Sequence, residues 1–344
     1  MATNETHVGT SHNLLNYFGL LFNKGNTGTP FFNSLAKAMQ TSNWEFPTSI
    51  DFTSGGGTSQ PAITETASLT APTPSFVSRT QQKNFAQIFQ YAYSLSYGKL
   101  SASGKLSGIN TANTSANPAD EMAFQAAQKL IEMRNDMEYS FLNGAKQDGT
   151  HDDVAYKTQG ITGAITTNTL AAGSAELDYW MVAEIVEKIA AAFGDTRNLI
   201  LSARSINLLQ LNASCAKNGI AVLPTDRFIA GLRVQTLVTP FGDVSILPNE
   251  RVAQGVALIY NPTICHPVFM PVPGKGIVFD EPLAKTGAAE RRQVYAQAGL
   301  DYGAEWYHGK ITGIKTSFTR PDGTVDVKVT NTTASPVNTK EVTA

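Results

Sequence analysis

Hydrophobic residues recur at steps of three or four between residues 117 and 143, which is the spacing of an amphipathic helix. Asn117 suits the N-cap of this helix, Pro118 its first position, and Gly144 its C-terminal end. At about 1.5 Å per residue, the helix is roughly 40 Å long. We expect one face to be buried along its length, formed by Met122, Ala126, Leu130, Met133, Met137 and Phe141.

Alternating apolar and polar residues predict strands on both sides of this helix, at residues 44–52, 63–70, 84–97 and 293–306. The first three segments flank a Gly-, Thr- and Pro-rich stretch and together predict a long two-stranded β-ribbon. Such a ribbon is only marginally stable in water without a partner surface; an ordinary surface hairpin is the alternative. The last segment predicts one returning strand, on the order of 45 Å long at ~3.3 Å per residue, which we expect to pack lengthwise on the helix.

After residue 173 helices and strands follow one another in mixed order, which predicts a separate α+β unit. Amphipathic spacing predicts helices at 174–193 and 203–213. Short apolar runs predict strands at 199–201, 233–239, 244–247, 256–260 and 268–270.

The first 40 residues are rich in Asn, Thr and Gly and carry apolar patches at 14–22 and 31–39. Gly25, Gly28 and Pro30 interrupt any continuous helix in this region. We therefore expect an extended arm whose apolar patches dock on another chain rather than on each other.

Composition narrows the class of protein. Lys and Arg number 26 against 28 Asp and Glu, and no block of like charge suggests a nucleic-acid-binding arm, so sequence-specific DNA binding is not expected. No apolar run reaches the roughly 20 residues of a membrane span. The N-terminus lacks the basic and apolar regions of an export signal, which indicates synthesis in a cytoplasm. The two cysteines, Cys215 and Cys265, are expected to be reduced, structural thiols.

Motifs for catalysis or phosphate binding are missing: there is no P-loop, nucleophile elbow, zinc-protease motif or CxxC pair. Residues 273–276 resemble a phosphate loop only superficially and are expected to form a turn. His151, Asp152 and Asp153 are carboxylate and imidazole groups that could bind a cation, but a solvated loop explains them more simply. Cys265 and His266 are adjacent on an extended segment and point to opposite faces. We therefore predict no catalytic, cofactor or metal site.

The order of arm, ribbon, Ser/Gly-rich linker, long helix, α+β unit and returning strand resembles the major capsid proteins of tailed bacteriophages. Their Hong Kong phage-type fold is shared with encapsulins and with the floors of herpesvirus capsids. Two short sequences add to the likeness. The run of Thr29, Pro30, Phe31 and Phe32 resembles the opening of the arm in a phage capsid subfamily, and the run from Arg292 through Trp306 and His308 to Ile314 resembles its closing strand.

The resemblance implies an α+β fold with six parts. These are an N-terminal arm (1–43), an extended loop formed by the β-ribbon (44–103), a peripheral domain (104–160) with its spine helix (117–143), an inserted axial domain (161–289), the returning strand of the peripheral domain (290–320) and a C-terminal tail (321–344).

The resemblance also implies a structural virion protein, a major capsid subunit that self-assembles into an icosahedral head around phage DNA and is not an enzyme. An encapsulin-like cargo shell, a tail-fibre or adhesin module, and an enzyme without a recognised motif are the alternatives. Expected partners are further copies of the chain in hexamers and pentamers, scaffold, portal and decoration proteins, and DNA bound without sequence specificity; no membrane and no cofactor is expected. The expected location is the virion, preceded by the host cytoplasm.

We expect the ribbon to lie across a neighbouring subunit in the shell. Its two faces carry more apolar surface than an isolated hairpin can cover. The resulting candidates for intersubunit contact are Trp44, Phe46, Ile50, Phe52, Phe85, Phe89, Tyr91 and Tyr93. Lys83 in the same ribbon is a candidate for an isopeptide bond with a neighbour, although a solubilising charge on a strand edge explains it more simply.

Overall fold

The computed structural model describes residues 28–53, 60–101, 121–192, 194–220, 223–229 and 232–319. The predicted apolar patch at 14–22, the helix start at Asn117 and Pro118, and the tail at 321–344 lie outside these residues.

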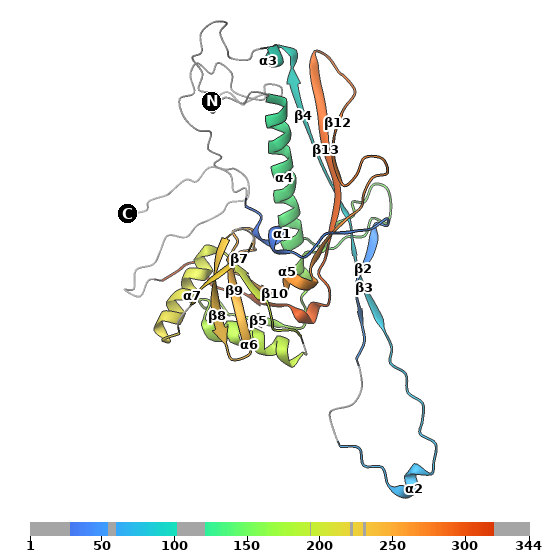
Figure 1. Cartoon of the computed structure of the whole chain (residues 1–344), viewed down its shortest axis with the longest axis vertical. Helices are drawn as coiled ribbons and strands as arrows, with labels where there is room; N and C mark the ends of the chain where they lie inside the picture. The colour runs from blue at the N-terminus through green and yellow to red at the C-terminus, as the bar shows by residue number, and fades with distance from the viewer. Residues whose placement is uncertain are drawn as a thin grey trace.

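A long helix and a five-stranded sheet form the upper part of the molecule in Figure 1. The helix, α4 (Glu121–Asn143), runs lengthwise along two strands of the sheet, β4 (Gln87–Ser96) and β13 (Ala289–Asp301). These two strands pair antiparallel over ten residue pairs. The remaining strands of this sheet are β1 (Met39–Gln40), β11 (His266–Phe269) and β12 (Val278–Pro282).

The core between α4 and the sheet follows from the two periods of the sequence. Alternate residues of β4 and β13 point to the same side of the sheet, and Phe89 lies opposite Ala296 in the register. Helical residues at steps of three and four meet them. The buried cluster includes Phe89, Tyr93, Met133, Met137, Phe141, Val294 and Ala296. The helix therefore packs on two paired strands, as part of a sheet, and not on one strand alone.

The returning strand has other limits than predicted. It begins at Ala289 and ends at Asp301, whereas Trp306 lies in a short 3-10 helix, η2 (Glu305–Tyr307). Gly303 explains the end of the strand: its φ of +63° is the left-handed conformation that glycine adopts readily, and its N–H is bound by the Asp301 carboxylate at 2.9 Å. The chain turns there and leaves the sheet.

Leu130 corrects the predicted burial of the helix face. Its side chain is 44% exposed, whereas Met133, Met137 and Phe141 are at most 4% exposed. The C-terminal half of α4 is enclosed on more than one side, because α1 (Pro30–Ser34) and α5 (Ile161–Ala164) pack against it in addition to the sheet. Helical spacing identifies a face but not how far along the helix other elements cover it.

The β-ribbon is shorter than the alternation predicts. Its paired strands are β2 (Glu45–Asp51) and β3 (Thr80–Phe85), which are antiparallel. The tip contains a single turn of helix, α2 (Glu65–Ser68), capped by the Thr64 hydroxyl, so the strand predicted at 63–70 is wrong. The strand predicted at 84–97 is divided: β3 ends in the ribbon, and β4 joins the five-stranded sheet and runs on into α3 (Tyr97–Ser101).

A seven-stranded sheet forms the second part of the molecule, at the lower left of Figure 1. Its order is β5-β14-β10-β6-β9-β8-β7. The bounds of its strands are β5 (Thr169–Ala171), β6 (Leu199–Ala203), β7 (Leu223–Ile229), β8 (Leu232–Thr239), β9 (Gly242–Pro248), β10 (Ala257–Tyr260) and β14 (Gly309–Thr312). The strands predicted at 199–201, 233–239, 244–247 and 256–260 are confirmed.

The central strand β6 is buried on both faces, which explains its continuous apolar sequence. Leu199 and Leu201 point into a core formed with α6 (Tyr179–Ala191) and α7 (Ser205–Lys217). Ile200 points the other way, into the core that contains α4. The seven-stranded sheet is therefore joined to the spine helix by a continuous apolar core.

The chain crosses between the two sheets after residue 260. A 3-10 turn, η1 (Pro262–Ile264), leads into β11 of the five-stranded sheet, and β12 and β13 follow in that sheet. The chain then returns to the seven-stranded sheet through β14. Each sheet is thus built from segments far apart in the sequence.

Candidate intersubunit surface

Four of the eight predicted contact residues are already buried within this chain. Phe46, Phe85, Phe89 and Tyr93 are between 3% and 8% exposed. Phe89 and Tyr93 belong to the core under α4, and Phe46 packs with Ala86 and Val268 at the base of the ribbon. The structure therefore gives these four side chains a role inside the subunit, and the predicted contact with a neighbour needs correction for them.

Two further candidates are occupied by contacts within the chain. Trp44 stacks on Tyr156, with ring centroids 5.0 Å apart and an angle of 7° between the planes. The Tyr91 hydroxyl donates a hydrogen bond to the Asp136 carboxylate of α4. Burial and this carboxylate both raise the pKa of Tyr91. Both aromatic side chains thus bind the ribbon base and β4 to the rest of the subunit.

Ile50 and Phe52 are the two candidates whose side chains remain open. They are 58% and 60% exposed and lie where β2 enters the tip of the ribbon. The structure adds exposed apolar residues that the sequence pattern did not identify as contacts. These are Ile63 (74%), Leu69 (85%), Phe76 (94%) and Val77 (57%). Ile63 and Leu69 belong to the alternating segment 63–70, which predicts a strand, whereas Phe76 and Val77 stand among Thr, Pro and Ser without a regular period.

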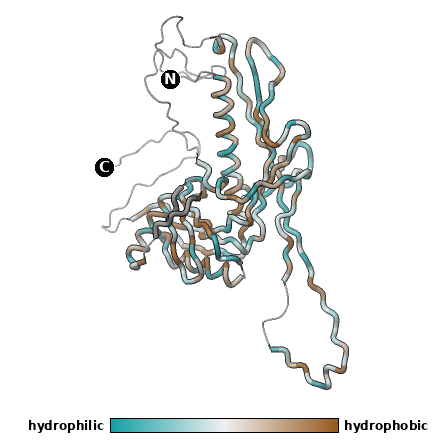
Figure 2. Tube along the Cα trace, in the orientation of Figure 1, coloured by the Kyte–Doolittle hydropathy of each residue, from teal (hydrophilic) through white to brown (hydrophobic). Residues whose placement is uncertain are grey.

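The tip projects away from both sheets (Figure 1), and hydrophobic segments alternate there with hydrophilic ones (Figure 2). Single exposed apolar residues are common on protein surfaces, but four or more within one projecting loop are not. The tip is therefore an apolar surface that the described part of the chain leaves uncovered.

The base of the ribbon is fixed firmly to the subunit. A Cβ atom added at Gly299 of β13 would lie 2.7 Å from the Phe85 carbonyl oxygen and 2.8 Å from the Phe46 ring, so only glycine allows this close approach. Lys83 and Glu45 form an ion pair across the two strands. The buried Asn84 side chain donates to the carbonyl oxygen of Leu300 at 2.7 Å. The direction of the ribbon is thus set by contacts at its base, and its tip is left open.

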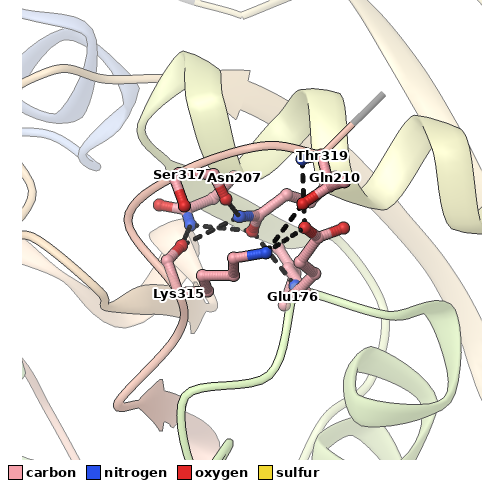
Figure 3. Close-up of polar contacts among 7 residues, drawn as sticks. Glu176, Asn207, Gln210, Lys315, Ser317 and Thr319 are labelled. Atoms are coloured by element: carbon pink, nitrogen blue, oxygen red, sulfur yellow. Dashed lines mark hydrogen bonds and ion pairs between the residues drawn. The ribbon is translucent and has the colours of Figure 1, made fainter. Parts of the chain in front are cut away.

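Residues 315–319 are anchored at the other side of the molecule (Figure 1, Figure 3). The buried Gln210 side chain of α7 donates to the carbonyl oxygens of Lys315 and Ser317, each at 2.8 Å. The Glu176 carboxylate accepts from the Lys315 ammonium at 2.9 Å and from the Thr319 N–H at 3.1 Å. This network fixes the described C-terminal end of the chain to the seven-stranded part of the molecule.

Cys265 and His308 come within 3.8 Å of each other, although their sequence positions gave no reason to pair them. Both are fully buried, and burial raises the pKa of the Cys265 thiol. The His308 Nδ1 atom accepts from the Asn261 N–H at 3.2 Å, and Nε2 lies 2.7 Å from the Tyr302 carbonyl oxygen, to which it donates. A neutral imidazole fits this arrangement. A buried thiol beside a neutral imidazole is a structural pair, not an activated nucleophile.

Burial lowers the pKa of His308 to about 4, which predicts acid sensitivity. Between this value and the ordinary value of about 6.5, the unfolded chain binds a proton that the folded chain does not. The free energy of unfolding of the unassembled subunit should therefore fall by about 3 kcal/mol as the pH decreases through this window. Urea titrations across the window measure the loss.

The comparison variant is His308→Asn, whose amide oxygen can still accept from the Asn261 N–H. This variant should be less stable at neutral pH but should lose less stability on acidification. The exposed His151, replaced by Asn, is the matched control and should leave the pH dependence unchanged. Parallel pH profiles for the parent and His308→Asn would contradict the assignment to His308.

The other candidates for a metal or phosphate site have little structural support. The part of the chain that the structure describes contains no group of three or more His, Cys, Asp or Glu arranged to hold a metal ion. His151, Asp152 and Asp153 are exposed in a turn. Val272 and Gly276 pair across the turn predicted at 273–276. Within the described ranges, no helix has the length and apolar character needed to cross a membrane.

Solved structures with a similar fold include chains of phage capsids and an encapsulin. A chain of the cyanophage A-1(L) capsid is 8% identical, with a TM-score of 0.60, over 91% of this chain and 100% of that chain. A chain of the capsid of the Myoviridae phage XM1 is 13% identical, with a TM-score of 0.54, over 87% and 97%. The SrpI encapsulin of Synechococcus elongatus is 10% identical, with a TM-score of 0.54, over 80% and 85%. The fold is thus the Hong Kong phage-type capsid fold, as the sequence predicted.

The chain belongs to the SU10 major capsid protein family, whose sequence model matches residues 2–315. No curated protein matches it. The protein is a structural capsid subunit of the virion that assembles in many copies, and its family is not one of enzymes.

Proposed function

We propose that the ribbon acts as the clamp that joins this subunit to a neighbour in an icosahedral head enclosing phage DNA. The observation that supports the proposal is the uncovered apolar surface of the tip, from Ile50 and Phe52 through Leu69 to Phe76. Burying one such side chain contributes about 1.5–3 kcal/mol. Several together can offset the cost of ordering the tip, about 1–2 kcal/mol for the backbone of each residue.

The two sheets correspond to two domains in this proposal. The five-stranded sheet with α4 forms the peripheral domain, and the seven-stranded sheet with α6 and α7 forms the axial domain, whose loops gather at the symmetry axes of hexamers and pentamers. The net charge of −2 supports close packing of many copies, because it adds little repulsion between them. In the same proposal, residues 1–43 form the N-terminal arm and residues 321–344 form the C-terminal tail.

The remaining partners follow from the class of protein. A head that encloses DNA needs a portal for its entry and is commonly built on a scaffold, so we propose scaffold and portal proteins as partners, with decoration proteins on the finished shell. Contacts with the packaged DNA are non-specific in this proposal, since the sequence has no basic block. Assembly takes place in the host cytoplasm.

Hydrogen exchange tests the clamp. Backbone amides of residues 60–79 have no strand partners among the described residues and should exchange rapidly before assembly. In assembled shells, the same amides should become protected, because a neighbour covers the tip. Amides in the C-terminal half of α4 are the internal control and should be protected in both states. Equally rapid exchange of the tip in free subunits and in shells would show that the ribbon is a surface hairpin.

A further inference from the structure

A buried carboxylate lies where three parts of the chain meet. Glu138 of α4 is 0% exposed. On one side of it lies α1, which belongs to the N-terminal arm, and on another lies Asn249, which directly follows β9 of the seven-stranded sheet. Acidic side chains are rarely buried in this way unless their charge is satisfied.

The three hydrogen bonds of Glu138 fit an ionised carboxylate. Oε1 accepts from the Phe31 N–H at 2.9 Å and from the Asn249 amide at 2.8 Å, and Oε2 accepts from the Phe32 N–H at 2.6 Å. All three partners are donors. A neutral acid or an amide at this position would place one of its own hydrogens against a donor. The three donors therefore favour an ionised carboxylate, which only accepts hydrogen bonds.

The arm continues from this point across both sheets. Ser34 and Tyr260 of β10 share a hydrogen bond between their hydroxyl groups, 2.7 Å long. The Ala36 N–H donates to the Cys265 carbonyl oxygen at 2.9 Å, and β1 then pairs in parallel with β11. The apolar patch at 31–39 thus docks on its own chain, which corrects the prediction that it docks on another. Glu138 supplies the only charged contact to the backbone of α1 among the described residues.

Burial and the polar neighbours of Glu138 act on its charge in opposite directions, and burial has the larger effect. Burial raises its pKa, and the N–H groups of Phe32 and Phe31, the Asn249 amide and the Arg251 charge act in the other direction. Burial, and to a smaller extent the charge of Glu138, raises the pKa of Tyr260 in β10. Replacing a buried charge with apolar groups often stabilises a protein, and some buried charges are kept because they specify one arrangement.

We propose that Glu138 is a positioning residue for assembly: its carboxylate holds the arm at residues 29–40 in one orientation relative to α4 and the seven-stranded sheet, so that subunits of one shape enter the shell. Apolar contacts of Phe31 and Phe32 attract the arm to α4. Two hydrogen bonds from consecutive N–H groups to one carboxylate fix its direction, because they allow a single placement of the backbone.

The first test is Glu138→Gln in the full-length, unassembled subunit. Its amide has the size of the carboxyl group but cannot accept from all three donors. Loss of a hydrogen bond to a charged group should speed amide exchange at Phe31 and Phe32 by about ten- to a hundredfold. Glu138→Asp is the second variant. Its side chain is one methylene shorter, so its carboxylate cannot reach the donors, and the same loss of amide protection is expected. Glu132→Gln, on the exposed side of the same helix, is the matched control and should leave both amides protected.

The second test measures the size of assembled particles, and it rests on the proposed function. Glu138→Gln should give particles of mixed size under conditions where the parent gives one size. Val186→Ala, which removes buried methyl groups from α6, is the control for lost stability alone and should keep the parental size. Unchanged protection of Phe31 and Phe32 in both Glu138 variants would overturn the proposal, and so would uniform particles from Glu138→Gln. Failure of the ribbon clamp would not affect the exchange measurement, because that measurement uses unassembled subunits.

Discussion

Shells should fail to form when the tip of the ribbon is removed, while the subunit itself stays folded. The change replaces residues 52–79 with an Asn-Gly turn, which suits a tight connection between the paired residues Asp51 and Thr80. The cores under α4 and under α6 and α7 contain no residue of the deleted segment. Unfolding temperature should therefore change little. Sedimentation velocity and electron microscopy, under conditions where the parent assembles, should find free subunits or open fragments in place of closed shells.

A second variant tests the apolar side chains of the tip without shortening the ribbon. Replacing Ile63, Leu69 and Phe76 with Ser keeps the whole ribbon but removes most of the exposed apolar surface, and it should weaken assembly strongly. Thr66→Ala and Ser75→Ala, on the same loop, are the controls and should assemble normally. Closed shells of parental heat stability from the deletion variant would show that the ribbon does not join subunits.

Met137→Asp should destabilise the subunit strongly, whereas Leu130→Asp should change its stability little. Both residues lie on the predicted apolar face of α4, but Met137 is 4% exposed and Leu130 is 44% exposed. An aspartate at 137 would bury a carboxylate among Phe89, Phe141 and Val294 without a partner, at a cost of about 3 kcal/mol or more. An aspartate at 130 can reach water, so its cost should stay below about 1 kcal/mol.

Urea unfolding of unassembled subunits measures both effects. Glu132→Asp, an exposed position between the two, is the control for the lower helix propensity of Asp. Equal losses of stability at 130 and 137 would show that the helix is covered along its whole length. Normal stability of Met137→Asp would remove Met137 from the core.

The sequence by itself determined those helices and strands whose apolar residues recur at a regular local spacing. The steps of three and four between Met133 and Phe141 identified the buried side of α4, and alternation identified β2, β4 and β13 because side chains on a strand point to opposite faces. The lack of a catalytic motif together with the order of elements led to the capsid fold. Short-range patterns of this kind do not depend on what packs against the element.

Only the tertiary structure decided which surfaces the chain covers by itself. Tyr93 and Ile50 both stand on apolar positions of alternating strands, yet one lies under α4 and the other is open to solvent, because β4 pairs with β13 and β2 does not. The role of Glu138 was equally hidden. Its helical position says nothing of Phe31, more than a hundred residues earlier, or of Asn249, more than a hundred residues later. Contacts between distant segments depend on the packing of whole sheets, and no local period in the sequence encodes them.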